Sequence, residues 1–296
     1  MINGSQEGIR WRLLVRPSYA VSYAQKFSNT PSNNYQPKKN TAEGVLRKKS
    51  IQRLRNCVEW LRLFSEPKYV WQKSKRKGYF FKLNFITLTL SDIQVHEDSY
   101  IVQHMLQPFI KWMQREAGVR NYVWRAEVQP KRLKNLKQRC IHFHITTNKF
   151  IHWRKIRSKW NDIQARHGYT TDGADENSTD VHAIINEGKI VNYIAKYMTK
   201  VDANPLMKVY CKVWGANHLL SNLKAVVKEE SHNDFWKILE EYRAVVPSER
   251  FEIPYITIYK HRLTTETQLP LKITEELMHA RKLFMVGDDG VKKYVS

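Results

Sequence analysis

Apolar and polar residues alternate along several stretches in the middle of the chain, which is typical of β-strands with one buried face. In residues 85–90, apolar residues occupy every second position from Ile86 onward, and threonines lie between them. Residues 121–129 and 140–147 alternate in the same way, and residues 181–185 predict a shorter strand. We therefore expect these four segments to be strands.

Segments with helical periodicity lie between and around these strands. A helix that begins at Asp98 or Ser99 is expected to kink at Pro108, because proline has no N–H to donate. Acidic, turn-rich residues 170–180 predict a loop. Helices are predicted over residues 45–64, 98–117, 153–167, 188–200, 234–243 and 274–282, and a further strand over residues 252–259. This mixture of elements predicts an α+β fold with a helical C-terminal extension.

The charge of the chain indicates a polyanionic partner. Its 296 residues include 50 Lys+Arg against 28 Asp+Glu, for a net charge of +22 and a pI near 9.8. Because 42% of residues are hydrophobic and 12% aromatic, a disordered polycation is excluded. Nucleic acid is the commonest polyanion that such a protein binds, and a merely solvated basic surface is the alternative.

The first 80 residues form a basic N-terminal region that carries much of this charge. They hold 17 Lys/Arg and 4 Asp/Glu and end in the basic run of residues 73–78. Aromatic residues lie among these charges: Trp11, Tyr19, Tyr23, Phe27, Tyr35, Trp71 and Tyr79. Cations bind phosphates and aromatic faces stack on unpaired bases, so the mixture suits single-stranded nucleic acid. The alternative is that half of these aromatic residues belong to a core.

Other classes of protein are excluded by what the sequence lacks. No apolar run approaches the length of about 20 residues that a membrane span needs. The first 14 residues do not have the pattern of a secretory signal, and no P-loop motif is present. The three cysteines (Cys57, Cys140 and Cys211) form no CxxC pair, so neither a disulfide framework nor a structural zinc site is expected. We expect a reduced, cytosolic setting.

A pair of histidines in residues 140–147 is the first candidate for chemistry. His142 and His144 are two residues apart on a predicted strand, so both project from one face while the apolar residues beside them face the other. An antiparallel hairpin with residues 121–129 would bring Glu127 alongside both histidines. Such a His/His/Glu set is a plausible site for Mg²⁺ or Mn²⁺. The alternatives are an exposed histidine pair, and a Glu127 that pairs only with Arg125 or a nearby lysine.

The predicted helix over residues 188–200 is the second candidate. Tyr193, Lys196, Tyr197 and Lys200 are spaced as i, i+3, i+4 and i+7 and so share one stripe. A buried unpaired ammonium is costly, so this stripe should face a groove or solvent. A phenol beside an ammonium suits attack on a phosphodiester, with tyrosine as nucleophile and lysine near the phosphate charge.

With these motifs in order, the chain resembles the HUH endonucleases. Within them it is similar to the two-tyrosine rolling-circle replication initiators of microvirus-like single-stranded DNA phages. Residues 85–90 look like the family's first motif, the HxH of residues 141–144 its second, and the YxxKYxxK of residues 193–200 its third. The strand with Glu127 and residues 213–216 also look like family segments. The resemblance covers residues 80–215, with a longer and more basic connector at residues 131–139.

The resemblance implies a fold and a mechanism. The family fold is a central antiparallel β-sheet flanked by helices, an RRM-like palm. Glu127, His142 and His144 would hold a divalent ion against the scissile phosphate. Tyr193 or Tyr197 would attack, leaving a 5′-phosphotyrosine and a free 3′-hydroxyl. Lys196 and Lys200 would steady the phosphate, with Lys200 preferred.

The implied function is initiation and termination of rolling-circle replication. A transposase or plasmid relaxase with the same chemistry, and a non-catalytic single-stranded nucleic-acid-binding protein, remain alternatives. We expect residues 1–80 to contact DNA, residues 81–215 to form the nicking domain and residues 216–296 to form an α/β extension. Expected partners are single-stranded DNA at an origin and a host helicase, polymerase and single-strand-binding protein, in the cytoplasm of a bacterial host.

Overall fold

The computed structural model is divided by its contacts into two units. One unit holds residues 40–222, and the other holds residues 1–39 with residues 223–296. The structure describes residues 9–15, 19–26, 46, 48–65, 68–72, 76–170, 177–184, 205–222, 226–230, 233–234, 236–237, 240, 248–253 and 256–262. None of the helices in this described part combines the length and apolar character of a membrane span.

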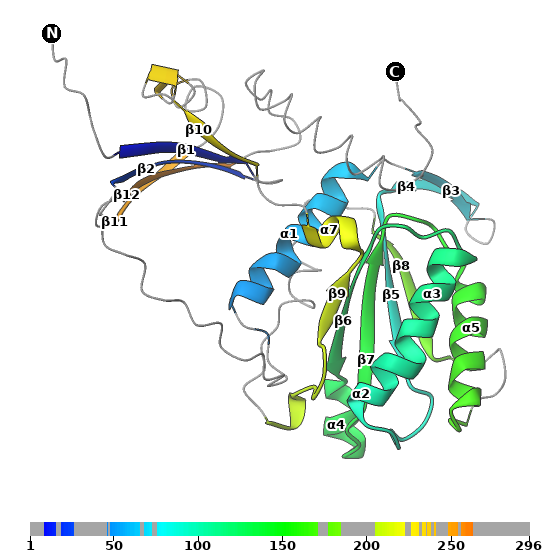
Figure 1. Cartoon of the computed structure of the whole chain (residues 1–296). Helices are drawn as coiled ribbons and strands as arrows, with labels where there is room; N and C mark the ends of the chain where they lie inside the picture. Colours follow the sequence, from blue (N-terminus) through cyan, green and yellow to red (C-terminus); the bar gives the residue numbers. More distant parts are fainter. Residues whose placement is uncertain are drawn as a thin grey trace, which may run out of the picture. The chain divides into compact units, whose positions relative to one another are not determined.

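The larger unit is built on a five-stranded antiparallel sheet (Figure 1). In spatial order its strands are β8 (Thr179–Ile184), β5 (Leu83–Thr89), β7 (Ile141–Thr147), β6 (Tyr122–Val128) and β9 (Trp214–Ala216). The strands predicted from alternation are confirmed, with β8 beginning two residues earlier than expected. The predicted α+β class is also confirmed.

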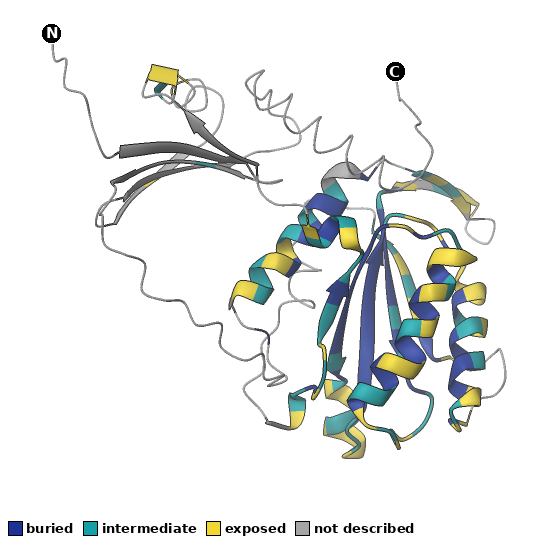
Figure 2. Cartoon of the chain, viewed as in Figure 1, coloured by how far each residue is buried: buried dark blue, intermediate teal, exposed yellow. Residues whose placement is uncertain are grey.

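Helices cover one face of this sheet, as Figure 1 shows for α3 and α5. The first helical run consists of α2 (Asp98–Tyr100), a π-helical stretch η2 (Ile101–Leu106) and α3 (Gln107–Arg115). The second is α5 (Trp153–Arg166). Their buried side chains meet the apolar face of the strands in one core, which the dark blue of Figure 2 marks. Both helices were predicted.

The π-helical turn is the local response to Pro108. The N–H of Gln107 bonds to the carbonyl of Val102, five residues back, directly before the proline. Proline has no N–H, so a regular helix would leave a carbonyl unpaired at this point. The widened turn takes up the distortion without breaking the helical run.

Two further helices in this unit lie next to the sheet edge formed by β6 and β9. The predicted helix α1 (Lys48–Phe64) packs against both strands and against α7 (His218–Asn222). The Sγ of Cys57 in α1 donates a hydrogen bond to the carbonyl of Leu220 in α7 at 3.4 Å. All three cysteines are free thiols.

The basic connector between β6 and β7 contains a short helix, α4 (Pro130–Leu136), which was not predicted. A proline in the first turn of a helix was the available signal, since its missing N–H has no partner there in any case. Lys137 then ends the helix in a left-handed conformation. A 3₁₀ turn, η4 (Pro205–Met207), precedes β9.

A separate two-stranded sheet, β3 (Lys68–Gln72) with β4 (Lys77–Phe81), precedes β5 in the chain. The sequence prediction had only the basic run of residues 73–78 here, and that run links the two strands and begins β4. The hairpin was therefore missed.

The smaller unit joins both ends of the chain in a second five-stranded antiparallel sheet. Its spatial order is β10 (Val226–Glu230), β1 (Ile9–Val15), β2 (Tyr19–Lys26), β12 (Ile256–Arg262) and β11 (Ser248–Ile253). The single strand predicted over residues 252–259 is wrong, because two strands flank residues 254–255. Pro254 in the middle of that prediction was the signal against one continuous strand.

Two of the remaining predicted helices concern the C-terminal residues. Residues 233–234, 236–237 and 240 are helical, within or beside the helix predicted over residues 234–243. The helix predicted over residues 274–282 lies outside the described residues. The functional division at residues 80 and 215 stays a prediction, because it concerns DNA contact and nicking, and not packing.

Candidate metal centre

The hairpin of β6 and β7 sets the register of the candidate site. Glu127 lies directly opposite His142, and Arg125 lies opposite His144. Residues that face each other across an antiparallel pair project from the same side of the sheet. The predicted antiparallel hairpin is thus confirmed, and it brings Glu127 alongside both histidines.

The alternation of β7 fixes which way the histidines point. Ile141, Phe143 and Ile145 are fully buried in the core beneath the helices. His142 and His144 therefore project from the opposite face, where both are nonetheless buried. The same period places Glu127, which is half-buried, on that face.

The three side chains meet at the carboxylate of Glu127, and we call Glu127, His142 and His144 the metal triad. Oε1 of Glu127 lies 2.9 Å from Nε2 of His142 and 3.0 Å from Nε2 of His144. The three candidate ligand atoms lie within 4.8 Å of one another. Donor atoms around Mg²⁺ or Mn²⁺ lie about 3 Å apart, because each is about 2.1 Å from the ion. The metal triad thus fits one divalent ion, and three ligands leave further positions open.

Two residues of β5 hold the ring of His144. The hydroxyl of Thr87 lies 3.1 Å from Nδ1 of His144, and Phe85 stacks on the imidazole with ring centres 5.0 Å apart. A metal-binding imidazole uses one nitrogen for the ion and fixes its orientation through the other. Because a hydroxyl both donates and accepts, Thr87 can serve His144 in either tautomer. Sequence reasoning missed both residues as parts of the site.

Electrostatics favour the metal-binding forms of the triad. Burial alone would raise the pKa of Glu127, but hydrogen bonds and charge from His142 and His144 outweigh it and hold this pKa well below its ordinary value. Burial lowers the pKa of His142, against the opposing hydrogen bond to Glu127. At neutral pH the site therefore offers an ionised carboxylate and a neutral imidazole, which are the forms that bind metal ions.

Arg125 adds a buried positive charge on the same face of β6. Burial lowers its pKa, and the charge of Glu127 acts in the opposite direction. A guanidinium two residues from a metal-binding carboxylate suits contact with an anion at the metal. Sequence analysis named Arg125 only as an alternative partner of Glu127.

The tyrosine helix is not placed relative to the metal triad. Tyr193, Lys196, Tyr197 and Lys200 all lie outside the described residues. Their proposed roles therefore stay predictions.

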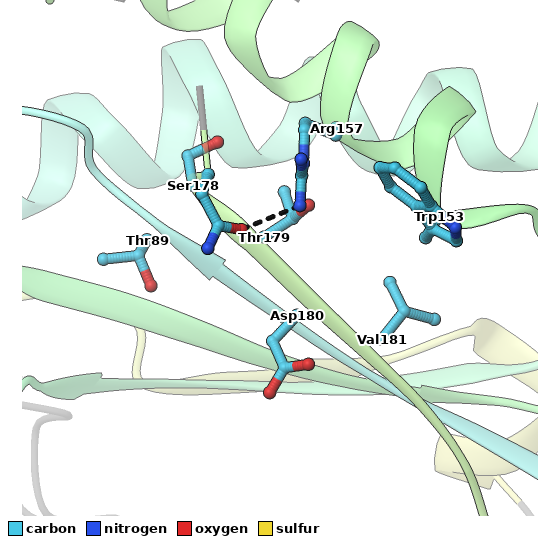
Figure 3. A pocket seen from close by; sticks show the side chains of 8 residues that line it. Thr89, Trp153, Arg157, Ser178, Thr179, Asp180 and Val181 are labelled. Atoms are coloured by element: carbon cyan, nitrogen blue, oxygen red, sulfur yellow. Dashed lines mark hydrogen bonds between the residues drawn. The ribbon is translucent and has the colours of Figure 1, made fainter. Parts of the chain in front are cut away.

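A second hollow, with a volume of about 380 Å³, lies between the start of α5 and the start of β8 (Figure 3). Its lining consists of Thr89, Trp153, Arg157, Asn177, Ser178, Thr179, Asp180 and Val181. Figure 3 shows Arg157 donating a hydrogen bond across the hollow, to Asn177 at 2.7 Å. The guanidinium of Arg157 also lies 4.6 Å from the ring centre of Trp153. Hydrogen-bonding groups beside an indole suit a polar ligand, but no local pattern joins these three separate segments.

The basic connector of residues 131–139 divides its cations between two tasks. Arg132 donates to the carbonyl of Leu90 at 2.8 Å, and Arg139 pairs with Asp98 at 2.5 Å. Those two arginines brace the fold. The lysines of the connector (Lys131, Lys134 and Lys137) are exposed and can meet DNA.

The region around the metal triad is similar to a known family of replication proteins. Residues 83–202 match the model of the replication-associated protein ORF2 family. The match starts at the first residue of β5 and includes the metal triad, and it extends through the YxxKYxxK of residues 193–200. Similarity to the ORF2 family is consistent with a rolling-circle replication initiator. Neither the curated proteins nor the solved structures gave a match to the chain.

Proposed function

We propose that the chain is a metal-dependent, site-specific single-stranded DNA endonuclease and strand transferase. In this role it initiates and terminates rolling-circle replication through a 5′-phosphotyrosine intermediate. The observation that carries the proposal is a Glu/His/His cluster with metal-ligand spacing inside the region that matches the ORF2 family. The family's description as replication-associated favours this role over that of a transposase or plasmid relaxase.

The metal triad would hold one divalent ion, Mg²⁺ or Mn²⁺, next to the scissile phosphate. A bound divalent ion supplies charge neutralisation and polarises a phosphoryl oxygen. Thr87 and Phe85 keep the ring of His144 oriented toward Glu127. Arg125 contributes a fixed positive charge on the same face.

Tyr193 or Tyr197 would be the nucleophile. The phenolic oxygen forms a bond to phosphorus while the bond from phosphorus to the 3′-oxygen breaks, and the phenolic proton is replaced on the product side by the proton of the new 3′-hydroxyl. A free tyrosine titrates near pH ~10, so phenolate character has to be stabilised as the bond forms. Lys196 and Lys200 are proposed to supply that positive charge, with Lys200 preferred.

The covalent ester conserves the energy of the phosphodiester, so strands can be rejoined without ATP. Two tyrosines allow a second cleavage while the first still holds DNA, as each unit-length circle requires. The proposed partners are single-stranded DNA at an origin and a host helicase, polymerase and single-strand-binding protein. The proposed setting is the bacterial cytoplasm.

The test is nicking of a library of single-stranded origin oligonucleotides with Mn²⁺ or Mg²⁺. We expect cleavage that EDTA abolishes and that His142→Ala with His144→Ala reduces at least about a thousandfold. The matched control is His104→Ala with His218→Ala, which removes two exposed histidines and should nick like the wild type. Calorimetry with Mn²⁺ should show binding to the wild type and control but not to the triad variant. Cleavage that persists in EDTA or in the triad variant would contradict the proposal.

A further inference from the structure

The hairpin of β3 and β4 displays three large aromatic side chains to solvent. The exposed fractions are 56% for Tyr69, 55% for Trp71 and 62% for Phe80. Scattered single exposures of this kind are ordinary, but three neighbouring aromatic rings on one short hairpin form a contiguous surface. We call Tyr69, Trp71 and Phe80 the aromatic platform.

Strand register places the platform on one face of the hairpin. Tyr69 lies opposite Phe80, and Trp71 lies opposite Gly78. The other face is anchored to the larger unit, since Phe81 is only 2% exposed and its ring centre lies 5.9 Å from that of Phe150. The hairpin therefore has one buried face that fixes it and one open face that carries the aromatic rings.

Gly78 is the residue that lets Tyr69 lie across the hairpin. A Cβ at position 78 would fall 1.8 Å from the hydroxyl oxygen and 2.2 Å from the Cζ atom of Tyr69. Real side chains do not approach so closely, so only glycine leaves room for the phenol ring over β4. The ring of Tyr69 continues to that of Phe80, with centres 5.1 Å apart. Close packing of this kind supports an ordered aromatic surface.

Positive charge surrounds the platform. Residues 67–82 contain no Asp or Glu, and their cations are Lys68, Lys73, Lys75, Arg76, Lys77 and Lys82. Of these, Arg76 and Lys77 are exposed where β4 begins. An exposed apolar surface ringed by cations alone is poorly suited to an ordinary hydrophobic protein interface, whose rim carries both signs of charge. It suits a ligand that combines flat aromatic faces with negative charge.

We propose that this aromatic platform binds single-stranded DNA, stacking unpaired bases on Tyr69, Trp71 and Phe80 while Arg76 and Lys77 contact the phosphates. Every base has a π-face, so stacking on aromatic side chains holds single strands without reading their sequence. The platform lies outside residues 83–202, which match the replication family, and shares no residue with the metal triad. It rests on the proposed function only for the choice of DNA as the polyanion.

The experiment separates aromatic stacking from general hydrophobic contact. In the full chain, Tyr69→Leu, Trp71→Leu and Phe80→Leu together keep apolar side chains but remove all three rings. Fluorescence anisotropy with a labelled oligo-dT in EDTA should show affinity at least about tenfold weaker, since losing one stacked base costs a factor of about 5 to 150. The variant with Tyr69→Phe and Trp71→Phe keeps the rings and should bind within about threefold of the wild type.

A matched control removes exposed apolar groups elsewhere in the same unit. Ile93→Ala, Val95→Ala and Leu136→Ala together should bind oligo-dT like the wild type. Arg76→Gln with Lys77→Gln should make the slope of log affinity against log salt shallower by about 1.4, for two phosphate contacts with a single strand.

Several results would overturn the proposal. Unchanged oligo-dT affinity in the triple leucine variant excludes stacking, and so does an equal loss with duplex DNA. A platform that mediates contact between copies of the chain would show as a change in sedimentation mass in the triple leucine variant, with oligo-dT affinity unchanged. Because the assay contains EDTA and scores only binding, its failure is distinct from a failure of metal-dependent nicking.

Discussion

Thr87 shows how a single residue outside the metal triad can control it. Its hydroxyl is the partner of Nδ1 of His144, and the ligand nitrogen of that ring points at Glu127. A ring without this partner can rotate about its χ2 angle, so the donor geometry loosens. The effect belongs to metal affinity and should leave the fold intact.

Thr87→Val keeps the shape of the side chain and removes its hydroxyl. We expect Mn²⁺ affinity to fall about 10- to 100-fold in calorimetry, because partners of this kind orient metal-binding imidazoles. Thr87→Ser, which keeps the hydroxyl, should bind within about threefold of the wild type. Equal loss in both variants would show that the methyl group, and not the hydroxyl, matters.

Asp98 provides a second residue whose environment predicts a measurement. It is buried, and it accepts hydrogen bonds from Arg139, from Gln94 and from the backbone N–H of Tyr210. Burial alone would raise the pKa of Asp98, but these hydrogen bonds outweigh it and place the pKa below its ordinary value. The unfolded chain therefore binds a proton more readily than the folded one at this residue.

Asp98 should stabilise the fold above the ordinary pKa of an aspartate, and this contribution should be lost as the pH falls through and below that value. Asp98→Asn should lower the free energy of unfolding by about 2–3 kcal/mol at pH 7 and by less at pH 3, as measured by urea denaturation. The exposed Asp162→Asn, which loses a surface pair with Arg166, is the control and should change it by less than about 1 kcal/mol. A loss for Asp98→Asn that grows toward low pH would contradict this sign.

At the scale of elements, β9 reaches the sheet edge only because Gly215 is small. Gly215 lies opposite Trp124, and a Cβ there would be 2.6 Å from Nε1 of the indole. Trp124 is buried in the core, so its ring has little freedom to give way. The segment that carries Gly215 is one that sequence analysis marked as similar to the replication family.

Gly215→Ala should therefore destabilise the chain, although the same change in an open strand would be stabilising. We expect a loss of about 1–3 kcal/mol in urea denaturation, typical of overpacking. Ala216→Ser, at the next and half-exposed position, should stay within about 0.5 kcal/mol of the wild type. A stabilised Gly215→Ala variant would show that Trp124 yields without cost.

Local patterns predicted the hairpin of β6 and β7 because everything it needs lies within a short stretch of sequence. Alternation gave the faces, and antiparallel pairing gave the meeting of Glu127 with His142 and His144. The role of Thr87 could not be predicted in this way, since it depends on β5 lying beside β7. The hollow next to Trp153 is likewise built from three segments that no spacing rule joins.

The smaller unit escaped prediction for the same reason. Residues 9–13 alternate apolar residues with Arg10 and Arg12, which is itself a strand signal. The partners of β1, however, are β2 and β10, and β10 begins at Val226, far along the chain. A pairing of that kind is decided by tertiary contacts and leaves no local trace.

At the scale of the whole molecule, the net charge of +22 far exceeds what the proposed chemistry uses. The metal triad, Arg125 and two lysines account for only a small part of it. The rest includes the cations around the aromatic platform and the exposed lysines of the connector. This surplus is expected to govern the grip on DNA and not the chemical step.

Binding of single-stranded DNA should therefore depend on salt more steeply than cleavage does. We expect a slope of log affinity against log salt steeper than about −3, for contact with more than about four phosphates. The single-turnover rate of cleavage at saturating protein should change by less than about threefold over the same salt range. A cleavage rate as salt-sensitive as binding would place most of the charge at the scissile phosphate.

The central claim is that tyrosine chemistry takes place at the metal triad, and a covalent adduct tests it most directly. Wild-type protein incubated with Mn²⁺ and a labelled origin oligonucleotide should give a denaturation-resistant protein–DNA species. Trypsin cuts after Lys196, so Tyr193 and Tyr197 fall in different peptides and mass spectrometry can assign the linkage. We predict DNA on one of these two peptides, and no adduct with Tyr193→Phe plus Tyr197→Phe or with His142→Ala plus His144→Ala. An adduct on another residue, or an undiminished adduct in either double variant, would contradict the account.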